Sequence, residues 1–157
     1  MIRNIIFDLG NVLISFRPSE YMDRKAYSEE LKAKILSDIF HASEWLQLDN
    51  GDITLPDAID AISEKSSLTK EEIAQIFNLR TDMMVPFDQN VNLLPELKKR
   101  GYRLYYLSNF PMDIFPEIKL TNHFFKFFDG GIISAEVRHS KPNIRIYEIL
   151  LEKYSLK

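Results

Sequence analysis

The chain has 157 residues, a formal net charge of −3 and no cysteine. The lack of cysteine excludes disulfides, thiolate catalysis and cysteine-bound zinc. With 45% hydrophobic and 27% charged residues, the composition is typical of a globular protein. The sequence has no basic stripe with interleaved aromatic residues, the pattern that predicts nucleic-acid binding. Its apolar runs are too short to cross a bilayer. We therefore expect a cytoplasmic protein that binds neither nucleic acid nor a membrane.

The chain opens with a predicted buried strand at residues 2–7, which runs directly into Asp8, with Gly10 two places later. The next long stretch, residues 17–85, shows helical patterns and no convincing strand. Thr69 and Glu72 have the spacing of a capping box, which predicts a helix start there. The helices expected in this stretch cover residues 19–26, 28–39, 42–48, 54–65 and 69–84.

The second half of the chain alternates helices and strands. A helix predicted at 91–100 ends in basic residues followed by Gly101, which is a stop signal. Strands are expected at 102–107 and 131–134, and a helix at 142–154 with a proline in its first turn. This alternation predicts the α/β class, with a parallel Rossmann-like sheet joined by crossover helices.

The predicted organisation is therefore a sheet core interrupted by a helical insert. The core is expected to consist of residues 1–16 and 86–157, with three strands. The insert, residues 17–85, follows the first strand as a helical cap.

Polar residues follow each of the three predicted strands. Asp8 follows the first strand, Ser108 and Asn109 follow the second, and Lys141 lies in the loop after the third. The carboxyl ends of parallel strands meet at one edge of a sheet, where ligands gather. We therefore expect a carboxylate, a hydroxyl, an amide and an ammonium group to form one site.

These groups suit phosphoryl transfer. The Asp8 carboxylate can attack phosphorus and form an aspartyl-phosphate, which splits one difficult step into two. Lys141 and a Mg²⁺ ion would offset the negative charge of the phosphoryl group, and Ser108 can donate a hydrogen bond to it. The backbone N–H groups of Leu9 and Gly10 can form an anion-binding nest in the turn after the strand.

Three motifs, in order, resemble those of the haloacid dehalogenase-like hydrolase superfamily. The stretch IIFDLGNVL resembles the first motif and places Asp8 at the nucleophile position; LSN at 107–109 resembles the second. The stretch SAEVRHSKPNIRIYE resembles the segment that carries the third-motif lysine, here Lys141. WLQLDNGDIT, at 45–54, looks like a segment common in helical caps of this superfamily. The DLGNV sequence is most similar to a sugar-phosphate-phosphatase-like subgroup, which implies a small phosphorylated metabolite as substrate.

Two departures from the family pattern bear on activity. Gly10 stands where many phosphatases of the superfamily have a second aspartate that acts as general acid and base. The family also has a fourth motif, an acidic pair after a further strand, which completes its Mg²⁺ site. No such pair follows Lys141, so the resemblance implies a Mg²⁺ site that is incomplete in this sequence, with Asp8 and the Gly10 carbonyl as ligands. It also implies missing C-terminal strands, which would leave the first strand as an exposed edge open to self-association.

Two alternative functions remain open from the sequence. The first is a metal-free 2-haloacid dehalogenase, in which Asp8 would displace halide. The second is a non-catalytic fragment, which the missing acidic pair favours. Among other polar residues, Asp113 is interpreted as a helix start and Asp129 as a turn residue. His41, His123 and His139 lack metal-ligand spacing.

Overall fold

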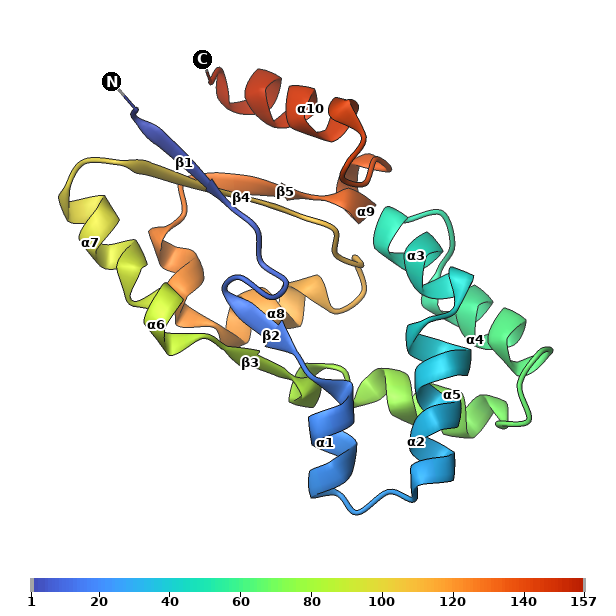
Figure 1. Ribbon diagram of the computed structural model, residues 1–157. Helices are drawn as coiled ribbons and strands as arrows, with labels where there is room; N and C mark the ends of the chain where they lie inside the picture. Colours follow the sequence, from blue (N-terminus) through green and yellow to red (C-terminus); the bar gives the residue numbers. More distant parts are fainter. Residues whose placement is uncertain (1, 157) are drawn as a thin grey trace.

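A three-stranded parallel sheet is the centre of the computed structural model, which describes residues 2–156 (Figure 1). Its strands are β1 (Asn4–Phe7), β4 (Arg103–Ser108) and β5 (Gly130–Ile133), in the order β1-β4-β5. Both strand pairs are parallel, so the three carboxyl ends lie at one edge of the sheet. The α/β class and the three predicted strands are confirmed.

Helices cover both faces of the sheet (Figure 1). On one face, α7 (Leu93–Lys99), α8 (Phe115–Thr121) and the 3₁₀-helix η3 (His123–Phe127) contribute to the main hydrophobic cluster. On the other face, α10 (Ile144–Tyr154) packs Ile146 and Leu150 against Leu107 and Ile132. The short helices α6 (Asp88–Val91) and α9 (Ser134–Val137) complete this part of the chain.

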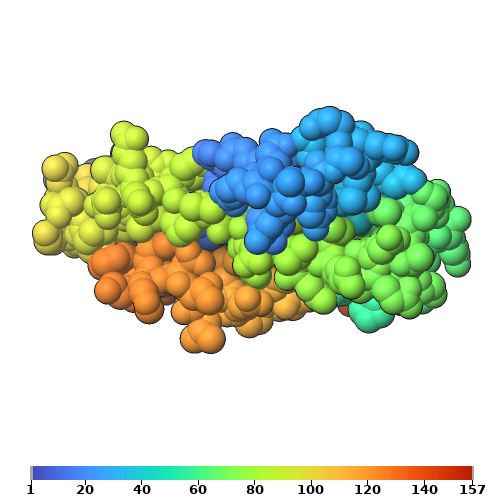
Figure 2. Space-filling model, turned by 90° about the horizontal axis from the view of Figure 1, so that it is seen from below, coloured from blue at the N-terminus to red at the C-terminus, as the bar shows by residue number. Residues whose placement is uncertain are grey.

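The helices between β2 and β3 have a hydrophobic cluster of their own. Seen from below, they form one end of the molecule, and α6 and α7 lie toward the other (Figure 2). These cap helices are α1 (Pro18–Arg24), α2 (Glu29–Ile35), α3 (Ser43–Asn50), α4 (Leu55–Ser63) and α5 (Lys70–Asn78). The boundaries at residues 17 and 85 stay a prediction. No helix within residues 2–156 is long and apolar enough to cross a membrane.

Side-chain caps set the starts of two of these helices. The predicted capping box of Thr69 and Glu72 is present at the start of α5, where each side chain accepts a hydrogen bond from the other residue's backbone N–H. A second capping box, formed by Thr54 and Asp57, starts α4. Each box satisfies backbone donors that a helix start leaves without partners.

The expected helix at 69–84 was wrong in its second half. Helix α5 ends at Asn78, a 3₁₀ turn η2 (Thr81–Met83) follows, and residues Met84–Pro86 form strand β3. Strand β3 pairs antiparallel with β2 (Ile14–Phe16), a strand that the sequence did not indicate. Three-residue strands are too short for an alternating pattern, and their pairing partners lie about 70 residues away in the sequence.

Two further helical predictions needed correction. The helix expected at 28–39 changes at Leu36–Phe40 into a π-helix, η1, because the backbone shifts to wider hydrogen bonds there. Between β4 and β5 lie α8, for which the sequence gave only a helix start at Asp113, and η3, which was not predicted. Their aromatic residues form part of the main core cluster, so tertiary packing rather than a regular polar–apolar pattern specifies them.

Strand β1 is an edge of this sheet within the described residues, because it pairs with β4 alone. We expect the chain to self-associate through this edge, since Ile6 on β1 is 44% exposed beside open backbone groups. Replacing Ile6→Lys should shift the sedimentation distribution toward monomer, because charged side chains on an edge oppose strand pairing. Leu120→Lys, at an exposed residue of α8, is the matched control and should leave the distribution unchanged. A monomeric unsubstituted chain would contradict the prediction.

Candidate active site

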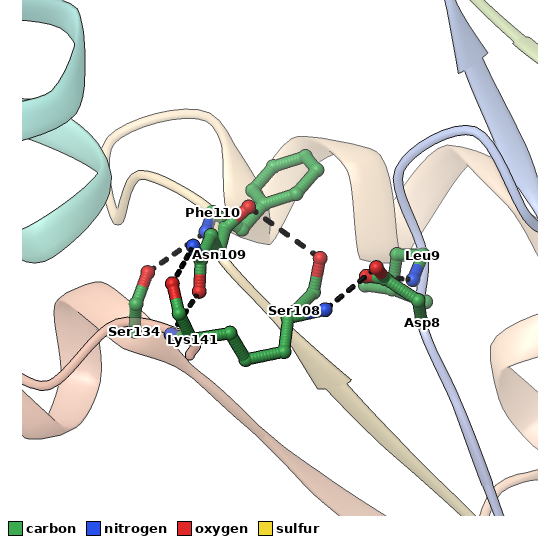
Figure 3. A network of polar contacts seen from close by, with 7 residues as sticks. All are labelled: Asp8, Leu9, Ser108, Asn109, Phe110, Ser134 and Lys141. Carbon is green, nitrogen blue, oxygen red and sulfur yellow. Dashed lines mark hydrogen bonds and ion pairs between the residues drawn. The ribbon is translucent and has the colours of Figure 1, made fainter. Parts of the chain in front are cut away.

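An ion pair joins the end of β1 to the loop after β5. Lys141 Nζ lies 2.6 Å from Asp8 Oδ2, and the backbone N–H of Leu9 donates to Asp8 Oδ1 at 2.8 Å (Figure 3). The Asp8 side chain is 38% exposed and the Lys141 side chain 21%, so solvent and a small ligand can reach both. The structure thus brings together the carboxylate and ammonium groups that the sequence placed about 130 residues apart.

A tight turn holds Asp8 at the edge of the sheet. The fully buried Leu9 anchors it, and the Leu9 carbonyl accepts hydrogen bonds from the N–H groups of Val12, Leu13 and Ile14. Gly10 follows with open space around it: a Cβ added there would meet no atom within 4 Å. Packing therefore does not require glycine at this position. The Leu9 N–H contacts Asp8 itself, and its role in phosphate binding stays a prediction.

Ser108 and Asn109 lie at the end of β4, between the two charged residues. Ser108 is 1% exposed, and its Oγ donates to the Asn109 carbonyl at 3.4 Å. The Asn109 amide accepts from the Lys141 N–H at 2.8 Å and donates to the Lys141 carbonyl at 3.0 Å. Asn109 therefore fixes the backbone that carries the lysine (Figure 3). The sequence indicated Asn109 as a phosphate ligand and gave no sign of this positioning contact.

The last residues of α3 and the following Gly51 contact the segments that carry the site. Ser134 Oγ accepts from the Phe110 N–H at 2.9 Å and donates to the Asp49 carbonyl. Ser140 Oγ donates to Asn50 Oδ1 at 2.7 Å. Gly51 makes the closest approach, because a Cβ added there would lie 2.7 Å from the Ala135 carbonyl oxygen. These contacts hold the cap beside the loops after β4 and β5.

A buried arginine makes a second link between the cap and the core. Arg80, which follows α5, is 1% exposed and pairs through both terminal nitrogens with Asp113, in the loop between β4 and α8. Asp113 lies two residues before α8, which begins at Phe115 without a side-chain cap, so its carboxylate pairs with Arg80 and does not cap the helix. Asp129, in the bend before β5, accepts from the Leu104 N–H and pairs with Lys98. The sequence did not single out Arg80, since its partner lies 33 residues away.

Asp49, on α3, lies near this pair. Burial is the main cause that raises the pKa of the Asp49 carboxyl to about 7; the Asp113 carboxylate adds to the rise, and Arg80 opposes it. Because the pKa is raised, the carboxyl is neutral below about pH 7 and ionises above it.

No model of a known family matches the chain. The chain is 28% identical over 148 residues to the sesquiterpene phosphatase astK of Aspergillus oryzae, which covers 94% of this chain and 72% of that protein. It is 34% identical over 96 residues to a glyceraldehyde 3-phosphate phosphatase of Methanothermobacter thermautotrophicus, over 60% of this chain and 42% of that protein. The chain thus spans less than half the length of this second relative.

Solved structures show the same fold. A HAD family enzyme from Bacteroides thetaiotaomicron, solved with magnesium and inorganic phosphate, has a TM-score of 0.72 at 23% identity, over 99% of this chain and 80% of that one. The L-2-haloacid dehalogenase of Xanthobacter autotrophicus has a TM-score of 0.71 at 16% identity, over 100% and 66% of the two chains. These structures share the fold of this chain, and its membership of the haloacid dehalogenase-like hydrolase superfamily, which the motifs indicate, stays a prediction. The resemblance to its sugar-phosphate-phosphatase-like subgroup stays a prediction.

The residues that the structure describes do not by themselves fit a magnesium ion. No group of three or more His, Asp or Glu side chains within residues 2–156 is placed to hold a metal. The predicted ligands, Asp8 and the Gly10 carbonyl, would leave most of the octahedral Mg²⁺ shell to water, so the protein would hold the ion weakly. Asp8 is moreover already paired with Lys141.

We therefore expect weak Mg²⁺ binding by the 157-residue chain. Calorimetric titration at neutral pH should give no saturation at micromolar Mg²⁺, because one carboxylate and one carbonyl form too small a ligand set. Asp8→Asn should leave the titration unchanged within error. Micromolar affinity that disappears in Asp8→Asn would contradict this prediction and would show that Asp8 takes part in a complete site.

Proposed function

We propose that this chain is a phosphatase-type hydrolase that acts on a small phosphorylated metabolite through an aspartyl-phosphate on Asp8. The observation that carries the proposal is the partly exposed Asp8 carboxylate at the carboxyl end of the sheet, 2.6 Å from the Lys141 ammonium group. A nucleophile and a cation at one point suit attack on an anionic phosphoryl group. The phosphatases among the relatives support the same reaction type.

In the first step, an Asp8 oxygen forms a bond to phosphorus while the bond from phosphorus to the ester oxygen breaks. The leaving alkoxide takes a proton from water, since Gly10 offers no acid. In the second step, water attacks phosphorus and gives a proton to the hydroxide left by the first step, the acyl phosphate bond breaks, and inorganic phosphate leaves the regenerated carboxylate. Lys141 pairs with Asp8 before reaction, and its three N–H donors can turn to the phosphoryl oxygens as charge develops there.

Other residues of the site act on the same phosphoryl group. Ser108, at the end of β4, can turn its hydroxyl from the Asn109 carbonyl to a phosphoryl oxygen. The N–H groups of Leu9 and Gly10 are proposed to complete the set of donors. Asn109 serves the reaction through Lys141, because its two hydrogen bonds fix the lysine backbone.

Two alternatives use the same site differently. In a 2-haloacid dehalogenase, Asp8 would attack carbon and displace halide; the fold likeness to the Xanthobacter enzyme favours this alternative. The sequence relatives with phosphatase names favour the phosphatase. A non-catalytic role is the second alternative, and the small set of metal ligands within residues 2–156 favours it.

Asp8→Asn should abolish hydrolysis of a generic phosphomonoester such as p-nitrophenyl phosphate, because an amide cannot act as the nucleophile. The fold should survive, since the two side chains have nearly the same shape. Asp88→Asn, at an exposed residue of α6, is the matched control and should keep full turnover. Turnover that persists in pure Asp8→Asn protein would contradict the mechanism.

The same assays separate the alternatives. Release of halide from a 2-haloacid in the presence of a chelator, without phosphate release from phosphomonoesters, would establish the dehalogenase instead. If the unsubstituted chain shows neither activity, the non-catalytic alternative holds.

Lys141→Ala and Ser108→Ala should each slow phosphomonoester turnover by about 10²-fold rather than abolish it, because each group stabilises charge that develops in the transition state. Initial rates at saturating substrate would measure the loss. Lys126→Ala, at an exposed lysine of η3, is the control and should have no effect. A Lys141→Ala rate equal to that of the unsubstituted chain would remove the lysine from the mechanism.

A further inference from the structure

Arg80 is the largest fully buried side chain of the described residues, and its charge needs a partner. Its Nε donates to the Phe77 carbonyl at 2.7 Å, and its guanidinium carbon lies 4.8 Å from the centre of the Phe77 ring. Both of these contacts lie within the cap. The Asp113 carboxylate is the charged partner, and it belongs to the core.

The Asp113 loop begins at the active site. Asp113 lies five residues after Ser108, and the intervening residues include Asn109, which holds the Lys141 backbone, and Phe110, whose N–H donates to Ser134. The ion pair therefore anchors the far end of the loop whose near end carries site residues. Because Arg80 is buried, loss of Asp113 would leave its charge without a counter-charge.

The neighbouring groups leave this pairing in place. Asp113 is 27% exposed and lines a cleft of about 400 Å³ with cap residues such as Leu48 and Ile53, so solvent reaches only one side of the pair. Among the described residues, Asp113 is the carboxylate within ion-pair distance of Arg80, and Asp49 makes no such pair. The geometry thus gives Arg80 one dominant counter-charge, across the boundary between cap and core.

We propose that Arg80 and Asp113 are a positioning pair that locks the cap to the loop after β4 and thereby sets Ser108, Asn109 and, through Asn109, Lys141. Neither residue touches the reacting atoms. The proposal relies on the proposed function only for a kinetic readout, because its effect on the loop can be measured without a substrate.

The sensors are two backbone amides, those of Phe110 and Lys141, which donate to Ser134 Oγ and Asn109 Oδ1. The test variant is Arg80→Met with Asp113→Asn, which removes both charges. Replacing a whole buried ion pair by neutral groups is often tolerated, so we expect a cooperative thermal unfolding transition. Amide exchange at both sensors should rise by at least about tenfold, because the loop opens locally when its anchor is gone.

The matched control is Lys70→Met with Asp60→Asn, an exposed pair that lies wholly within the cap at 2.7 Å. It receives the same kinds of substitution and should leave exchange at both sensors unchanged. If the Arg80/Asp113 double variant does not fold, Asp113→Glu provides the test, since it keeps the charge and moves the carboxylate. Exchange at Phe110 and Lys141 should then rise above that of the unsubstituted chain. Unchanged exchange in the folded variant would overturn the proposal.

The kinetic readout separates positioning from general stability. The double variant should show a kcat about tenfold lower on p-nitrophenyl phosphate with KM little changed, because the groups that act in the transition state are misplaced. Raised exchange in a chain without any phosphatase activity would support the lock and contradict the proposed function. Phosphatase activity with unchanged exchange would support the proposed function and overturn the lock.

Discussion

The candidate site depends on one ion pair, between Asp8 and Lys141. Its two residues belong to opposite edges of the three-stranded sheet, and β4 lies between them. The pair can form because all three strands are parallel, so that their carboxyl ends face the same side. Asn109, at the end of the middle strand, then fixes the lysine backbone in both directions. A carboxylate, a cation and the residue that orients the cation thus come from three consecutive strands of the sheet.

The packing below the site explains why these strand ends are well placed. From Leu104 to Ser108 the middle strand is buried throughout, and the Tyr106 ring packs against three phenylalanines of the helical layer. On the opposite face, Tyr154 of α10 hydrogen-bonds to both backbone groups of Gly131. A close-packed core transmits little movement to its edge, so the loops that carry Ser108 and Lys141 start from fixed points.

The cap adds constraints that the sheet alone does not provide. Strands β2 and β3 connect it to the core, the Asp49–Gly51 segment packs on α9, and Arg80 pairs with Asp113. The contacts of Asp49–Gly51 and the Arg80–Asp113 pair reach the segments after β5 and β4, which also carry residues of the site. The position of the cap and the geometry of the site are therefore linked through hydrogen bonds and a buried ion pair, and substitutions at the boundary affect both.

The sequence by itself determined the fold class, the three parallel strands and the residues that follow them. These features depend on local patterns: an apolar run that ends on Asp8, turn residues beside Gly101, and a capping box at Thr69. Such patterns arise because burial and helix-end hydrogen bonding act on neighbours in the chain. The order of short motifs also indicated the superfamily, which the comparisons with known proteins support.

Only the tertiary structure decided the contacts between residues distant in the chain. The β2–β3 pairing, the Asn109 contact with Lys141 and the burial of Arg80 against Asp113 each join segments 30 or more residues apart. No local pattern marks them, since a three-residue strand has no period and a single arginine after a helix usually reaches solvent. Their partners are chosen by packing, which is why Asp113 looked like a helix start in the sequence and is an ion-pair partner in the fold.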